Sequence, residues 1–146
     1  TAGSDQTLRL FDLDGEANEL VASVRFLDMP VKSAVFSGDD VFCSGRRNWL
    51  YVFDLESQSV SKVLCGKGGL QRREKSFERI VASPDGRFVT LLGDNGYLTT
   101  IDARSRGFVA DVKQPDAVRC AAWTGGPRAC CWPRATCASA GSKRCS

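Results

Sequence analysis

The sequence predicts an all-β protein built from repeated four-stranded units, and three observations support this. One stretch occurs three times without a gap, as AGSDQTLRLFD, SGRRNWLYVFD and LGDNGYLTTID, at residues 2–12, 44–54 and 92–102. Between the copies, VFSGDD, VASPDG and AWTGGP each end an apolar run in a turn. The closing aspartates Asp12, Asp54 and Asp102 lie 42 and 48 residues apart. A unit of roughly 40 to 45 residues with four short strands is typical of a WD40-type β-propeller blade.

Each copy of the repeat begins with a polar turn and continues as an apolar strand. The turns are residues 3–6 in the first copy and 94–96 in the third, where Gly96 suits the positive φ of a two-residue hairpin turn. In the second copy, the strand at residues 49–53 is apolar on both faces, since Leu50 and Val52 alternate with aromatic residues. Such a strand must be covered on both sides, as happens where one blade packs on the next.

The segments between the copies complete the pattern. Residues 83–86 read Ser-Pro-Asp-Gly, in which proline presets φ and glycine closes a tight turn. No window shows an apolar period of 3.6 residues, so no long helix is expected. The chain therefore divides into the end of a blade at 1–14, complete blades at 15–55 and 56–103, and the start of a further blade at 104–123.

About three blades result, whereas a propeller typically closes with about four to eight. The sequence thus predicts a partial, unclosed ring that belongs to a larger propeller. Its first residue, Thr1, is not methionine, which agrees with a fragment. The total number of blades and the intact length are not set by these residues.

The last 23 residues, 124–146, break the repeat. They contain no Val, Ile, Leu, Phe, Tyr or Met and are rich in Arg, Ala, Pro, Ser and Cys. This composition is typical of a GC-rich coding sequence read out of frame or through an intron. Because a segment with so few apolar side chains cannot offset its chain entropy, we expect a disordered tail.

The cysteines offer an alternative, a metal site in the tail. Four thiols are available there, at Cys130, Cys131, Cys137 and Cys145. Their spacing differs from the paired pattern of zinc sites, and the chain has no histidine. The odd total of seven cysteines also disfavours a disulfide scaffold. We therefore expect no metal and no cofactor, and buried free thiols at Cys43, Cys65 and Cys120.

The residues do not predict an enzyme. Because the segment has no histidine, it cannot form a Ser-His-Asp or Cys-His catalytic site by itself. The recurrence of Asp12, Asp54 and Asp102 at one position of the repeat indicates a strand-end or turn role rather than catalysis. Glycines at 66, 68 and 69 match no phosphate-binding loop motif and indicate a flexible connection. Catalysis would require residues outside this segment.

Charge singles out one candidate surface. The net charge of +3 comes from the tail, and the remaining residues carry 16 bases against 17 acids. No signal peptide and no apolar run of about 18 residues occurs, so no membrane partner is expected. The candidate contacts to RNA or a partner are Arg46, Arg47, Lys67, Arg72, Arg73, Lys75 and Arg79.

These bases allow two interpretations besides a merely solvated surface. Exposed arginines on propeller loops can contact RNA phosphates. Alternatively, these arginines and lysines bind a partner protein. We favour protein docking, because the repeat region is nearly neutral and no aromatic residues for base stacking alternate with these bases.

Three stretches, TAGSDQTLRLFDLDGEAN, LYVFDLES and GLQRREKSFERIVASPDGRFVTLLGDNGYL, resemble the C-terminal propeller of the U3 small nucleolar RNA-associated protein 18 family. The resemblance runs from Thr1 to about Trp123. It implies a non-catalytic, nucleolar WD-repeat scaffold of the small-subunit processome that supports pre-18S rRNA processing and small ribosomal subunit biogenesis. The implied partners are other WD-repeat proteins of that assembly and, directly or indirectly, the U3 snoRNP and pre-rRNA.

The chain departs from this family pattern in two respects. The strands expected after Trp123 are missing from the sequence, and Phe53-Asp54 stands where a Trp-Asp pair is usual. An alternative function is therefore a propeller adaptor in another complex, such as chromatin or ubiquitin-ligase machinery. A propeller enzyme is the more distant alternative.

Overall fold

The computed structural model describes residues 1–14, 18–26, 28–64, 76–94, 96–113, 118–123 and 129–133, the last two ranges as backbone alone. The described residues contain strands and turns but no helix. Consequently no helix among them is long and apolar enough to span a membrane.

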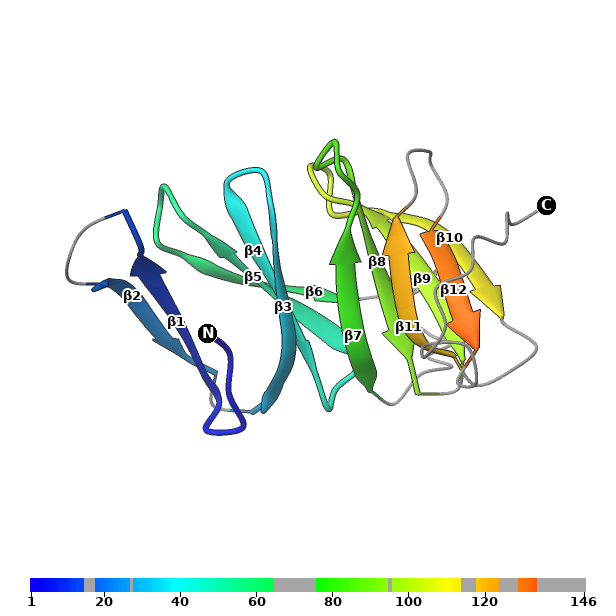
Figure 1. The fold of residues 1–146 in the computed structure, drawn as a ribbon, viewed down its shortest axis with the longest axis horizontal. Coiled ribbons are helices and arrows are strands. Elements are labelled where there is room, and N and C mark those ends of the chain that lie inside the picture. Colours follow the sequence, from blue (N-terminus) through cyan, green and yellow to red (C-terminus); the bar gives the residue numbers. More distant parts are fainter. Residues whose placement is uncertain are drawn as a thin grey trace.

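The strands form four antiparallel sheets that follow one another along the chain (Figure 1). The first sheet contains β1 (Thr7–Asp12) and β2 (Glu19–Arg25). The second contains β3 (Val31–Ser37), β4 (Asp40–Gly45), β5 (Trp49–Asp54) and β6 (Val60–Leu64). The third contains β7 (Phe77–Ala82), β8 (Phe88–Gly93), β9 (Tyr97–Asp102) and β10 (Phe108–Lys113). The fourth contains β11 (Val118–Trp123) and β12 (Ala129–Pro133).

Both four-stranded sheets are meanders, because each strand pairs with the next one in the sequence. Successive meanders stacked side by side are the architecture of propeller blades. The all-β class and the partial WD-type propeller predicted from the repeat are therefore confirmed.

The sheets are offset by one strand from the sequence units 15–55 and 56–103. The first unit holds β2 to β5, and β2 pairs with β1 of the preceding sheet. The second unit holds β6 to β9, and β6 pairs with β5 to complete the second sheet. Each unit thus adds its first strand to the sheet before it, which ties neighbouring sheets together. The blade boundaries themselves remain a prediction.

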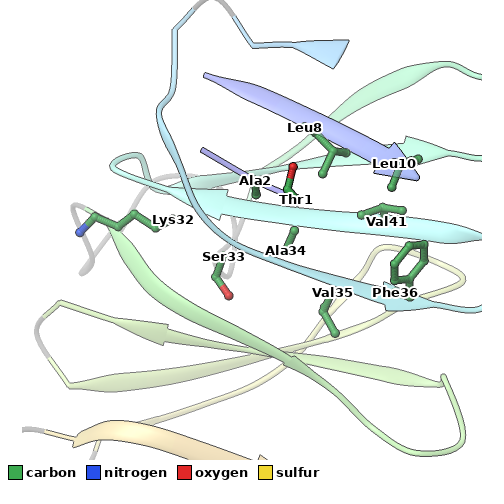
Figure 2. Close-up of a pocket in the computed structure, with 10 residues that line it drawn as sticks. All are labelled: Thr1, Ala2, Leu8, Leu10, Lys32, Ser33, Ala34, Val35, Phe36 and Val41. Carbon is green, nitrogen blue, oxygen red and sulfur yellow. The ribbon is translucent and has the colours of Figure 1, made fainter. Parts of the chain in front are cut away.

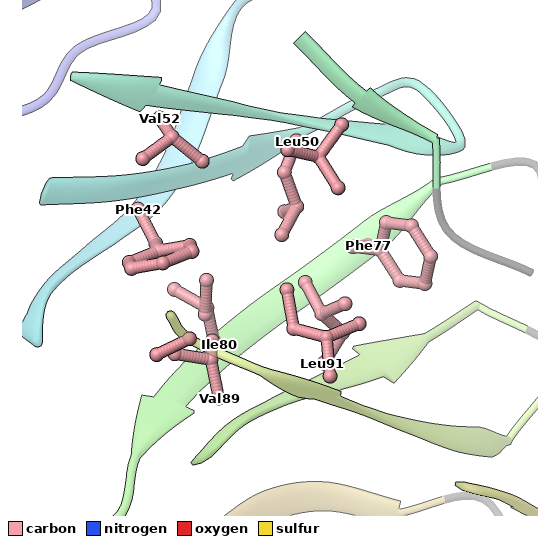
Figure 3. Packing of buried hydrophobic residues seen from close by; sticks show 10 residues of the cluster. Phe42, Leu50, Val52, Phe77, Ile80, Val89 and Leu91 are labelled. Atoms are coloured by element: carbon pink, nitrogen blue, oxygen red, sulfur yellow. The ribbon is translucent and has the colours of Figure 1, made fainter. Parts of the chain in front are cut away.

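The main apolar core lies between the second and third sheets (Figure 3). Leu50 and Val52 of β5 are fully buried in it, opposite Ile80 and Leu91 of the third sheet. On the other face of β5, Phe53 packs in a second cluster with residues of the first sheet. Both faces of this strand are therefore covered, as its apolar pattern predicted.

Polar contacts also join β3, the edge strand of the second sheet, to β7 and to the β7–β8 turn of the third sheet. The Ile80 amide donates to Ser33 Oγ at 3.3 Å, and Ser37 Oγ donates to the Gly86 carbonyl at 2.9 Å. The Ile80 amide lies on the edge strand of the third sheet and the Gly86 carbonyl in the turn after it, so serine side chains of the second sheet satisfy backbone groups of the third. They hold the two sheets in a defined lateral position.

The predicted turns are confirmed. The Gly96 amide donates to the Gly93 carbonyl at 3.2 Å, and Gly96 has a φ of 81°. Gly86 closes the Ser-Pro-Asp-Gly turn with a φ of 66°, and its amide donates to the Ser83 carbonyl at 2.9 Å. In the first copy, Gln6 takes the position of glycine, with a φ of 66° that non-glycine residues seldom adopt.

The expectation of a structureless tail is wrong for one segment. Strand β12, at Ala129–Pro133, lies within residues 124–146 and pairs with β11. Strand pairing is made by backbone groups, so it does not require an aliphatic sequence, and Trp132 is of a residue type that favours strands. Residues 124–128 and 134–146, which include Cys137 and Cys145, lie outside the described residues.

Candidate interaction surface

The connections between strands gather at two opposite ends of the sheets (Figure 1). One end, here called the hairpin end, holds the turn at residues 3–6, the β4–β5 connection at 46–48 and the β8–β9 connection at 94–96. Strand β6 ends and β7 begins at this same end. The opposite end, here called the turn end, holds the connections at residues 38–39, 55–59, 83–87 and 103–107.

Two of the predicted contact residues lie at the tip of the β4–β5 hairpin. Arg46 and Arg47 are both exposed there. Arg79 is exposed on β7, but it shares a strand face with Val81, which packs on Leu92 and not on the second sheet. Arg79 is therefore separated from the hairpin tip. Lys67, Arg72, Arg73 and Lys75 lie outside the described residues.

Arg47 belongs to a cluster that we name the Asp28 cluster: Asp28, Arg47, Trp49, Tyr51 and Lys62. The Arg47 Nε atom donates to the Asp28 carbonyl at 3.2 Å, and the Tyr51 hydroxyl donates to the Asp28 carboxylate. Lys62 Nζ lies 3.5 Å from the same carboxylate. Both cations also approach the Trp49 ring, with Lys62 Nζ at 3.6 Å and the Arg47 guanidinium carbon at 5.6 Å from its centroid.

Hydrogen bonding sets the protonation of this cluster. The Tyr51 hydroxyl bond and the Lys62 charge lower the pKa of Asp28, which is therefore ionised at neutral pH. Burial, and the hydrogen bond to Asp28, raise the pKa of Tyr51, which stays protonated. Because two cations already contact Trp49, its ring is a poor platform for a stacked base.

Charges of both signs alternate at the hairpin end. Arg9 pairs with Asp5 at 2.9 Å, and Lys32 pairs with Glu78. Arg46 makes no ion pair with any other described residue. The described part of this end is thus a surface of mixed charge, which differs from the continuous basic groove of nonspecific nucleic-acid binders.

The turn end is acidic. Among the described residues its acids are Asp12, Asp14, Glu19, Asp39, Asp40, Asp54, Glu56, Asp85 and Asp102, and its bases are Arg87, Arg104 and Arg106. A phosphate backbone would be repelled by this excess of carboxylates. Contact with nucleic acid is therefore more favourable at the hairpin end.

The repeated aspartates are turn residues, as their spacing indicated. The Asp102 carboxylate accepts bonds from the Ser105 amide at 2.8 Å and the Arg104 amide at 3.1 Å. Asp54 accepts from the Ser57 amide at 2.8 Å. These donors stabilise the ionised form, so the pKa values of Asp54 and Asp102 are lowered. Their carboxylates are thereby engaged in local turns after β5 and β9.

Cys43 is a buried free thiol, as predicted. Burial raises its pKa to about 12. Within the described residues, no group of three or more His, Cys, Asp or Glu side chains is placed to hold a metal ion. Cys65 and the side chain of Cys120 lie outside the described part of the chain.

No family model matches the chain. Curated proteins do match it. The U3 small nucleolar RNA-associated protein 18 homolog of Arabidopsis thaliana is 34% identical over 128 residues, which cover 85% of this chain and 22% of the relative. The probable U3 small nucleolar RNA-associated protein 18 of Schizosaccharomyces pombe is 35% identical over 115 residues, or 77% of this chain and 22% of the relative. The chain belongs to the U3 small nucleolar RNA-associated protein 18 family.

The human U3 small nucleolar RNA-associated protein 18 homolog is 30% identical over 115 residues, 77% of this chain and 20% of its own length. The chain thus spans about a fifth of the length of these relatives. The family membership inferred from the repeated stretches is confirmed.

Of the Asp28 cluster in this family member, sequence reasoning singled out only Arg47 as a contact residue. Asp28 lies in the connector before β3, and Lys62 lies on β6, opposite Tyr51 in the β5–β6 register. Neither residue lies in a basic run. The sequence carries one weak signal for Lys62. It lies two residues before Leu64, and alternate residues of a strand share a face, so the Trp49–Leu64 pairing places Lys62 opposite Tyr51.

Proposed function

We propose that this chain is part of a non-catalytic WD-repeat scaffold that serves pre-18S rRNA processing and small ribosomal subunit biogenesis. The observation that carries the proposal is the stack of antiparallel sheets in a chain similar to proteins named as U3 small nucleolar RNA-associated. Stacked sheets expose their connecting segments at two ends, while their apolar faces pack against each other. Such a framework holds partners in position without taking part in covalent chemistry.

The proposed setting is the small-subunit processome of the nucleolus. Its other WD-repeat proteins are the proposed direct partners, and the U3 snoRNP and pre-rRNA are reached directly or through them. The exposed hairpin tip at Arg46 and Arg47 is the proposed contact, together with the basic residues Lys67, Arg72, Arg73, Lys75 and Arg79. Mixed charge and the covered Trp49 ring favour a protein partner at Arg46 and Arg47.

Charge reversal in the intact protein tests this function. Arg46→Glu with Arg47→Glu should reduce recovery of one protein partner, whereas U3 RNA crosslinks elsewhere on the protein stay unchanged. Arg104→Glu, an exposed arginine at the turn end, is the matched control. If the intact protein recovers neither U3 RNA nor processome proteins, the proposed function is wrong.

Salt dependence separates an RNA contact from a protein contact. Each lost phosphate contact should lower the salt slope of RNA binding by about one unit. A protein contact leaves that slope unchanged. A dominant RNA adduct in crosslinking at residues 67–79 would overturn the preference for protein docking.

A further inference from the structure

The first and third copies of the repeat close their hairpin turns within the backbone. The Gln6 amide donates to the Gly3 carbonyl at 3.2 Å, and the Gly96 amide donates to the Gly93 carbonyl at 3.2 Å. Gln6 and Gly96 have positive φ values of 66° and 81°. In the second copy the same position is Asn48, whose φ is not positive. The β4–β5 hairpin tip therefore differs in backbone conformation from its two counterparts.

A side chain attaches this tip to a neighbouring segment. Arg47 Nε donates to the Asp28 carbonyl at 3.2 Å, and the guanidinium carbon lies 5.6 Å from the Trp49 ring centroid. The residue at this position of the first copy is Asp5, which also bonds within the fold, since it accepts from the Thr7 amide at 3.2 Å. Arg47 thus ties the hairpin tip to the connector between the first and second sheets.

The connector that carries Asp28 is itself firmly held. Met29 is fully buried, and the Phe26 ring stacks on Tyr51 with the centroids 4.6 Å apart. The Asp28 carboxylate also accepts from the Tyr51 hydroxyl and lies 3.5 Å from Lys62 Nζ. A side chain that bonds to this connector is therefore tied to a well-packed part of the structure.

The cavity between the first two sheets is separate from this attachment. It has a volume of about 240 Å³ and is lined by residues 1 and 2 and by residues of β1, β3 and β4, among them Leu8, Phe36 and Val41 (Figure 2). The Asp28 cluster lies instead on β5, β6, the hairpin tip and the connector. The hold on the tip therefore does not depend on what fills the cavity.

Arg46, the neighbour of Arg47, is exposed at the tip. Its planar guanidinium carries donors in a fixed fork, which matches a carboxylate through two parallel hydrogen bonds. The charges at the hairpin end are mixed, and this favours a carboxylate of a protein over a run of RNA phosphates.

We infer that Arg46 and Arg47, although adjacent and both exposed, have different roles. Arg46 binds a carboxylate of a partner protein. Arg47 is a positioning residue, which holds the hairpin tip in place through its bond to the Asp28 carbonyl. The contact at Arg46 rests on the proposed scaffold function, whereas the role of Arg47 rests on the geometry of the Asp28 cluster.

Hydrogen exchange of the intact protein tests the role of Arg47. Arg47→Gln should raise the exchange rates of the amides of residues 46–49 by about two- to tenfold, the effect of losing one hydrogen bond. Arg46→Gln is the matched control and should leave these rates unchanged. Arg47→Lys should resemble Arg47→Gln, because lysine keeps the charge but lacks the Nε–H donor. Equal rates in the two glutamine variants would overturn the positioning role.

A zero-length crosslinker tests the contact at Arg46. In intact protein carrying Arg46→Lys, a carbodiimide should couple the introduced amine to a carboxylate of a co-purifying processome protein, and mass spectrometry locates the new amide. Arg47→Lys is the matched control and should form no such amide with a partner. Equal coupling of the two variants, or none from Arg46→Lys in the assembled complex, would overturn the assignment.

Two further outcomes also count against the contact. An ultraviolet crosslink from Arg46 of the unsubstituted protein to RNA would assign a phosphate, rather than a carboxylate, to this arginine. If the intact protein recovers neither U3 RNA nor processome proteins, the proposed function fails and the contact at Arg46 fails with it. Hydrogen exchange still decides the role of Arg47 in that case, so the two failures are distinguishable.

Discussion

Gly45 and Pro30 approach so closely that a β-carbon on Gly45 would lie 2.0 Å from the Pro30 carbonyl oxygen. Gly45 ends β4, opposite Val31 at the start of β3. The connector between the first and second sheets therefore passes directly over it. The contact is to backbone, which cannot move aside like the end of a flexible side chain.

Gly45→Ala should destabilise the intact protein by about 3 kcal/mol, since overpacking against backbone strains the sheet. Gly38→Ala is the control. Gly38 has a φ of 60° but open space around it, so alanine there meets backbone strain alone, about 1 to 2 kcal/mol. Denaturant unfolding measures the free energy of unfolding of both variants. Equal losses would show that the connector adjusts to the added methyl group.

Leu50→Ala should lower the free energy of unfolding by about 2 to 5 kcal/mol, because it leaves a cavity between two sheets. Leu50 is fully buried, whereas Leu20 of β2 is 50% exposed. Leu20→Ala is thus the matched control and should cost much less. A loss below about 0.5 kcal/mol for Leu50→Ala would mean that the strand is not buried in the intact protein.

Asp28→Asn should weaken the attachment of the β2–β3 connector to β5 and β6. The folded pKa of Asp28 is lowered from 3.8, so its stabilisation is present above that value and is lost as pH falls through the folded pKa. At pH 7 the loss should stay below about 1 kcal/mol, because the ion pair is solvent-exposed. Comparing unfolding near neutral pH and below pH 3.8 checks this, since the variant should lose less stability on acidification.

Cys43 should not react with alkylating reagents while the protein is folded. Burial raises its pKa from 9.0 to about 12, so the thiolate is scarce at neutral pH. The raised pKa also means that its contribution to stability is present below pH 9.0 and is lost as pH rises toward 12. Alkylation followed by mass spectrometry, with denatured protein as the control, measures this. Rapid modification of the native protein would contradict the buried placement.

The repeated sequence determined much of this protein. Strand alternation and turn residues act locally, so they predicted the turns at Gly86 and Gly96 and the two buried faces of residues 49–53. The stretches quoted above were also enough to predict the protein family. The aspartates that end the strands were recognisable as turn residues, because each one bonds within three residues of itself.

Only the tertiary structure decided which distant residues meet. The Asp28 cluster joins a connector, a hairpin and β6, and its contacts depend on the register that places Lys62 opposite Tyr51. The separation of Arg79 from Arg47 depends on the strand face that packs on the second sheet. Strand β12 arises because the backbone of β11 supplies a partner to a segment whose composition alone predicted none. Register and pairing are long-range properties, so no local pattern specifies them.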